Sequence, residues 1–138
     1  MWHRPHSSSL GSFARAAERA ILRIQPQLRA YPGAFASWLT ALDAASGPHW
    51  QLALLGRIDS PEFQELVLVS GERWLPHLVT AGGPPGVPEA PVLLRDRAPI
   101  GGRPTAYLCR DFRCDLPTGD PDALREQLTL AARPDALP

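Results

Sequence analysis

The stretch that decides the fold is Thr105 to Thr118, TAYLCRDFRCDLPT, in which a short apolar run leads into two cysteines. The run from Ala106 to Cys109 has the length of a strand and carries an aromatic ring, and turn-forming glycine and proline residues come just before it. Charged residues end the run. We therefore predict a buried strand with Cys109 at its carboxyl end and Cys114 in the loop that follows.

A helix is predicted after this loop. Asp120 offers a carboxylate cap for the first turn, and Pro121 suits the first helical position, where no backbone N–H is needed. Leu124, Leu128 and Ala131 then recur at helical spacing and define the face that we expect to be buried.

The same alternation of strand and helix occurs upstream. The run QLALL at 51–55 has the composition of a buried strand, Ser60 and Pro61 open a helix, and a second short strand is expected at 78–81. Apolar strands that alternate with amphipathic helices are typical of parallel sheets with helical crossovers. We therefore predict an α/β fold for residues 49–138, with a small parallel sheet of about three strands and flanking helices.

Residues 1–48 are predicted to form a separate helical hairpin. From Leu10 to about Ala30, apolar residues recur at helical spacing, although Pro26 should kink or end the regular part. After a break at proline and glycine, a second amphipathic pattern runs to Ser46. We expect the two helices to be antiparallel.

Aromatic side chains are expected in the core. Trp38, Trp50, Trp74 and Phe63 would suit either a packed core or a stacking platform for a ligand or nucleic acid. Their helical spacing, and the lack of an arginine stripe beside them, favour core packing.

The composition narrows the class of protein. Basic and acidic side chains balance at a formal net charge of zero, so there is no bulk electrostatic case for nucleic acid or an anionic membrane as a partner. No apolar run approaches the roughly 18 residues of a membrane span, and no signal-type segment follows Met1 to His6. These features predict a cytoplasmic protein.

Cys109 and Cys114 are the candidate site residues. Their spacing differs from the Cys-x-x-Cys of thioredoxin-type sites, and the predicted helix starts well after Cys114. A structural or incidental thiol pair is the simplest interpretation in the cytosol, and a redox-active pair is the alternative. Metal binding is disfavoured because structural zinc usually needs four Cys or His ligands. No cofactor or metal is predicted, and no catalytic residue is assigned.

Two further features of the sequence argue for structural roles and against a catalytic or anion-binding site. Parallel strands would place His77 and Cys109 at opposite ends of the sheet, roughly 10 Å apart, which disfavours a Cys–His dyad. The segment from Gly56 to Ser60 joins a strand to a helix N-terminus, where anions often bind, but it lacks the glycine-rich fingerprint and contains Asp59. We interpret this segment as a structural turn.

Several motifs together resemble a known family. The segment YLCRDFRC followed by LPTGDPDAL is the most specific, and LTALDAASGP, QLALLG, RWLP and HLVTAG precede it in order. From about Leu10 onward, the chain resembles the C-terminal end of the thioredoxin-domain-containing family that includes the spermatogenesis-associated protein and its bacterial YyaL-type relatives. The sequence departs from the family in its length and in Gly119, which is inserted before Asp-Pro.

The resemblance implies an order of domains. Relatives carry a thioredoxin-like domain, then an α/α toroid similar to six-hairpin glycosidases, then an α/β end, so residues 10–46 would be the last hairpin of a toroid whose other hairpins are missing. The function expected is that of a C-terminal structural or docking module without a complete active site. A small thiol-redox module using Cys109 and Cys114, and a remnant of a carbohydrate-processing enzyme, are the alternatives. The expected partner is a helical toroid domain, or a second copy bound through exposed helix faces.

Overall fold

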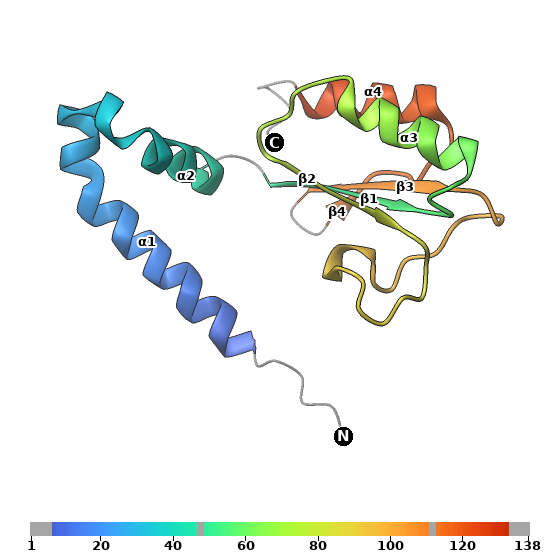
Figure 1. The fold of residues 1–138 in the computed structure, drawn as a ribbon, viewed down its shortest axis with the longest axis horizontal. Coiled ribbons are helices and arrows are strands. Elements are labelled where there is room, and N and C mark those ends of the chain that lie inside the picture. The colour runs from blue at the N-terminus through green and yellow to red at the C-terminus, as the bar shows by residue number, and fades with distance from the viewer. Residues whose placement is uncertain (1–6, 47–48, 111–112, 133–138) are drawn as a thin grey trace. The chain divides into compact units, whose positions relative to one another are not determined.

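The computed structural model describes residues 7–46, 49–110 and 113–132. The chain divides into two compact units, Met1–Gly47 and Pro48–Pro138, which are described separately (Figure 1). We refer to them below as the helical pair and the α/β unit.

The helical pair consists of α1 (Ser7–Ala30), the short 3₁₀ turn η1 (Pro32–Phe35) and α2 (Ala36–Ser46). Both helices were expected from the apolar spacing, and α1 continues through Pro26 rather than ending there. Among the described side chains of this unit, Leu28 is the one buried hydrophobic residue, at 4% exposed. The assignment of this pair to a toroid stays a prediction.

The α/β unit is built on a four-stranded sheet with the strand order β2-β1-β3-β4. Helices α3 and α4 cover one face of this sheet, and the segment around η2 lies against the other (Figure 1). In chain order the elements are β1 (Trp50–Leu55), α3 (Pro61–Gly71), β2 (Leu78–Gly83), η2 (Val92–Leu94), β3 (Thr105–Arg110), β4 (Arg113–Cys114) and α4 (Pro121–Ala131).

The sheet is mixed, so the prediction of a parallel sheet of about three strands is wrong in part. Strands β1 and β2 are parallel, joined by the crossover helix α3, as expected. Strand β3 runs antiparallel to β1, with Thr105 opposite Leu55. A parallel β3 would need a long crossover to bring the chain back to the edge where β1 starts. The segment between β2 and β3 contains only η2, so β3 begins where β1 ends.

The prediction of Cys114 in a loop is also wrong. Cys114 belongs to β4, a strand of two residues that pairs antiparallel with β3. The pairing continues along the chain, because the Asp115 N–H donates to the Leu108 carbonyl at 2.8 Å and the Ala106 N–H donates to the Thr118 carbonyl at 2.7 Å. The segment after Cys114 thus runs back along β3 to reach the start of α4.

The core of the α/β unit lies on both faces of the sheet. Beneath α3 and α4 the cluster consists of Leu52, Leu54, Phe63, Leu66, Val69, Ala106, Leu108, Leu124 and Leu128. On the other face, Ala53 and Leu55 pack with Leu94 of η2. The predicted burial of Phe63 is confirmed, but Trp74 is 86% exposed and Trp38 of the helical pair is 36% exposed, so their assignment to the core is wrong. Trp74 follows the end of α3, where the helical spacing that was used to place it no longer applies.

The starts of α3 and α4 are capped as the sequence predicts. The Ser60 hydroxyl accepts a hydrogen bond from the Phe63 N–H, and the Asp120 carboxylate accepts one from the Asp122 N–H. Proline occupies the first turn of both helices. Each cap therefore satisfies one of the N–H groups that a helix leaves unpaired.

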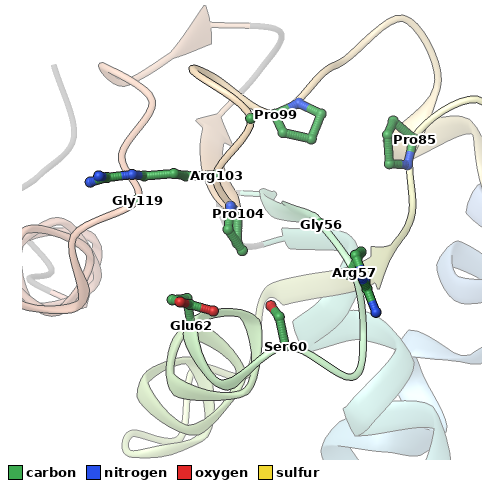
Figure 2. A pocket seen from close by; sticks show the side chains of 10 residues that line it. Gly56, Arg57, Ser60, Glu62, Pro85, Pro99, Arg103, Pro104 and Gly119 are labelled. Atoms are coloured by element: carbon green, nitrogen blue, oxygen red, sulfur yellow. The ribbon is translucent and has the colours of Figure 1, made fainter.

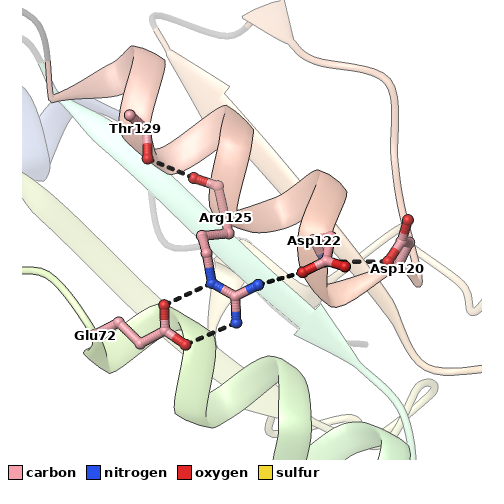
Figure 3. A network of polar contacts seen from close by, with 5 residues as sticks. All are labelled: Glu72, Asp120, Asp122, Arg125 and Thr129. Carbon is pink, nitrogen blue, oxygen red and sulfur yellow. Dashed lines mark hydrogen bonds and ion pairs between the residues drawn. The ribbon is translucent and has the colours of Figure 1, made fainter.

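An ion-pair network joins α3 to α4. The Arg125 guanidinium lies between Glu72, just after α3, and Asp122 in the first turn of α4 (Figure 3). Arg125 Nε donates to Glu72 Oε2 at 2.7 Å, and Nη2 donates to Oε1 at 2.8 Å, a bidentate arrangement. The hydrogen bond from Arg125 lowers the pKa of Glu72, and the same contact raises the pKa of Arg125.

Candidate functional site

Cys109 and Cys114 are joined by a disulfide bond. They are direct partners in the β3–β4 register, and their Cα atoms are 3.9 Å apart. The bond therefore links two adjacent strands across the edge of the sheet. The structure brings the two predicted site residues together, while their redox activity stays a prediction.

The two sulfurs have different environments. Cys109 is 1% exposed, whereas Cys114 is exposed on the edge strand. The difference follows from position, because β3 lies between β1 and β4 and β4 has no further strand beside it. Cys109 is thus enclosed by protein, whereas the Cys114 residue is accessible from solvent.

An arginine contacts the enclosed sulfur. Arg97 Nη2 donates to Cys109 Sγ at 3.5 Å. The same guanidinium donates to the Leu93 carbonyl and lies over the ring of Tyr107, with 5.9 Å between Cζ and the ring centroid. Tyr107 in turn donates its hydroxyl hydrogen to the Ala98 carbonyl at 2.6 Å. Arg97 is therefore held beside Cys109 by contacts from two elements.

Other charged groups lie near the disulfide. Arg110 and Arg113 are paired across β3 and β4, one residue from the cysteines, and the Arg110 guanidinium lies over the Trp50 ring at 5.5 Å. Asp115, which is exposed, follows Cys114 directly. Because side chains alternate between the faces of a strand, Arg110 and Arg113 lie on the face that carries Trp50, while Arg97 lies on the face of the disulfide.

No sequence pattern pointed to Arg97. It lies twelve residues before Cys109 in a segment without regular structure, and only the return of the chain into β3 brings the two together. Arg97 could have been found only if the antiparallel direction of β3 had been known.

His77 does not assist the cysteines. The prediction that His77 and Cys109 lie at opposite ends of the sheet is wrong, because β3 is antiparallel and Cys109 pairs with Gln51 near the start of β1. Both residues are thus at the same end, but β1 lies between β2 and β3. Two strand spacings separate them by roughly 10 Å, which is too far for a Cys–His dyad.

A cleft of about 640 Å³ lies at the other end of the sheet, where β1 leads into α3. Figure 2 shows Ser60 and Glu62 of the first helical turn facing Pro104, with Pro85 and Pro99 on the loops around them. Glu62 is the one carboxylate among the residues that line the cleft. This arrangement contains no pair of carboxylates and no nucleophile with an adjacent base.

The turn that leads into the cleft has structural roles. A Cβ atom at Gly56 would lie 2.9 Å from Pro104 Cβ, so glycine allows β1 and the start of β3 to approach closely. Arg57 donates to Asp59 at 2.8 Å, and this hydrogen bond lowers the pKa of Asp59. The ion pair is exposed, and it holds Arg57 at the edge of the cleft, which Arg57 also lines.

The described residues hold neither a cluster of metal ligands nor a membrane-spanning helix. No group of three or more His, Cys, Asp or Glu side chains that could hold a metal ion occurs among residues 7–46, 49–110 and 113–132. In the same part of the chain, no helix is both long and apolar enough to cross a membrane.

Comparison with known proteins identifies no family. No protein-family model, curated protein or solved structure matches the chain. The resemblance drawn from the sequence motifs therefore stays a prediction.

Proposed function

We propose that this chain is a structural and docking module, in which a self-contained α/β unit carries a pair of helices that bind to further helices of a toroid-type domain. The observation behind this proposal is the contrast in burial within the helical pair. Its described residues bury one hydrophobic side chain, Leu28, while Phe13, Leu22 and Tyr31 are 72%, 63% and 69% exposed.

Helices of this kind need an external surface to be stable. Most helical stability in proteins comes from packing an apolar face, and propensity alone leaves short helices marginal in water. Trp38 and Leu39 of α2 are exposed as well, so both helices present apolar side chains to solvent. Contiguous exposed apolar surface is typical of interaction sites, and the proposal takes these side chains to contribute to such a surface. Helices of a toroid are the partner that the family resemblance implies.

The α/β unit supports a structural role more than an enzymatic one. Glycoside hydrolysis normally uses two carboxylates on either side of the bond that is cleaved, and the cleft near α3 has Glu62 alone. The carbohydrate-processing alternative therefore has no support from the described residues, beyond the resemblance itself.

The docking proposal can be tested on the full chain. Scattering and binding of a hydrophobic dye should reveal self-association or an accessible apolar patch. The double variant F13S/I24S, which changes two residues of one face of α1, should reduce both signals, whereas the matched variant W74S/L116S, which changes two exposed residues of the α/β unit, should leave them largely unchanged. A monomeric chain that binds no dye, or equal effects of the two variants, would contradict the proposal.

Thiol–disulfide exchange is a second candidate function, and the Cys109–Cys114 bond with its arginine contact is the observation that favours it. A positively charged neighbour favours the thiolate, which is the reactive form of cysteine. The measurement is the reduction potential of the bond in glutathione buffers. A potential below about −300 mV would identify a structural bond and remove this candidate.

A further inference from the structure

We propose that the two sulfurs have separate roles in exchange: an incoming thiol bonds to Cys114, and Cys109 departs as a thiolate that Arg97 stabilises. This inference rests on the second candidate function, thiol–disulfide exchange. It assigns the attacked sulfur, the leaving sulfur and a positioning residue, none of which follows from the presence of a disulfide alone.

The first argument concerns access. A thiolate that opens a disulfide must reach one of the two sulfurs directly, and access decides which one is attacked. Cys109 is 1% exposed beneath the segment that carries Arg97, whereas Cys114 is exposed on a strand of two residues at the sheet edge. Attack from solvent is therefore directed to Cys114.

The second argument concerns the leaving group. A disulfide opens faster when the departing thiol has a lower pKa, and a neighbouring guanidinium favours the thiolate form. Arg97 already donates to Cys109 Sγ at 3.5 Å in the bonded state. Its contacts with the Leu93 carbonyl and the Tyr107 ring fix it there, so no rearrangement is needed when negative charge develops on the sulfur.

Arg97 is the described cation that contacts the disulfide. Side chains alternate between the two faces of a strand, so Arg110, which lies over the Trp50 ring, and its cross-strand partner Arg113 are on the other face of the sheet. Reduced glutathione serves as the thiol that probes the bond.

The step balances with glutathione as the co-reactant. The glutathione thiolate forms a bond with Cys114 Sγ, the Cys109–Cys114 bond breaks, and its electron pair moves to Cys109 Sγ. The reverse attack of Cys109 on the mixed disulfide restores the bond and releases the glutathione thiolate. A second glutathione thiolate completes the reduction by forming oxidised glutathione and leaving Cys114 as the second thiolate.

The test uses the folded full chain with reduced glutathione. Rapid acid quenching followed by peptide mass mapping should place the glutathione adduct on Cys114. The opening rate should fall severalfold to tenfold in R97Q and recover in part in R97K. The matched variant R95Q should leave the rate unchanged, because Arg95 donates to the Ala90 carbonyl instead of a sulfur.

A spectroscopic readout separates positioning from simple structural damage. In the C114S background, where Cys109 is the one thiol, thiolate ultraviolet absorbance should show that Cys109 ionises at higher pH with R97Q than without it, while circular dichroism confirms that both chains are folded. An adduct on Cys109, or equal rates and ionisation in R97Q and R95Q, would overturn the division of roles. Neither result would remove the exchange function. A folded bond that glutathione does not open, although the bond of the denatured chain opens, would overturn both.

Discussion

The helical pair and the α/β unit differ in how many of their apolar side chains they bury. In the α/β unit, residues from strands and helices meet in two clusters, and Leu52, Leu66 and Leu124 are completely enclosed. In the described part of the helical pair, apolar residues repeat with the helical period but Leu28 alone is buried. A periodic apolar pattern thus shows that a helix has a face to bury, but it does not show that the partner of that face is present.

The largest expected effect comes from matched leucine substitutions in the two units. Leu66→Ala should lower the free energy of unfolding by about 2–5 kcal/mol, because the side chain is fully buried and its loss leaves a cavity. Leu22→Ala should change it by less than about 0.5 kcal/mol, as is usual for exposed positions. Urea unfolding measured by circular dichroism provides both values. Similar losses in the two variants would show that the helical pair is packed in the isolated chain.

The disulfide should have the next largest effect, and it should act on the α/β unit alone. The bond closes a short loop, so its reduction should cost about 2 kcal/mol through the entropy of the unfolded chain. Thermal unfolding with and without dithiothreitol measures this loss, and the double variant C109S/C114S should not respond to the reductant. An unchanged transition after confirmed reduction would show that the bond does not stabilise the sheet edge.

Two serine hydroxyl groups, one in each unit, should have a smaller and unequal effect on the free energy of unfolding. Ser60→Ala should cost about 1 kcal/mol, because the hydroxyl caps α3 by accepting from the Phe63 N–H. Ser46→Ala should be nearly neutral, because that hydroxyl only donates back to the Leu42 carbonyl four residues earlier. Ser60→Asp, which retains a capping oxygen, is the control that should restore stability. Equal costs at the two serines would contradict this assignment.

The smallest effect concerns the ion pair between α3 and α4. The hydrogen bond from Arg125 lowers the pKa of Glu72. The ion pair therefore stabilises the folded chain above the ordinary glutamate pKa of about 4.3, and this stabilisation is lost as the pH falls through the lower pKa of the folded state. The Glu72→Gln variant should therefore unfold at a slightly lower temperature than the wild type at neutral pH, as thermal unfolding measures, and the difference should disappear in acid. A difference that persists in acid would point to packing rather than charge.

Local features of the fold and the parallel pair of β1 and β2 could be predicted from the sequence, but the direction of β3 could not. The helix starts at Ser60 and Asp120 were predictable because a cap involves only neighbouring residues. The direction of β3 depends on where the preceding connection leaves the chain. The proline-rich segment before it gave no sign that it stays at one edge of the sheet.

The candidate site was predictable only in part, for a related reason. Cys109 and Cys114 were identified by residue type, but their bonding requires the β3–β4 pairing, and a strand of two residues that begins with Arg113 has no sequence pattern. The contact of Arg97 with Cys109 depends on the antiparallel direction of β3 and on the path of the segment around η2. Errors in strand direction therefore extend to every contact that is distant in the sequence.

Hydrogen exchange on the full chain tests the contrast between the two units most directly. The amides of β1 and β3 should exchange only through global unfolding, because these central strands lie within the buried clusters, while the amides of α1 and α2 should exchange many times faster through local opening. That pattern is the predicted result. Protection of α1 and α2 equal to that of β1 would show that the helical pair already has a partner in this chain and would contradict the docking proposal.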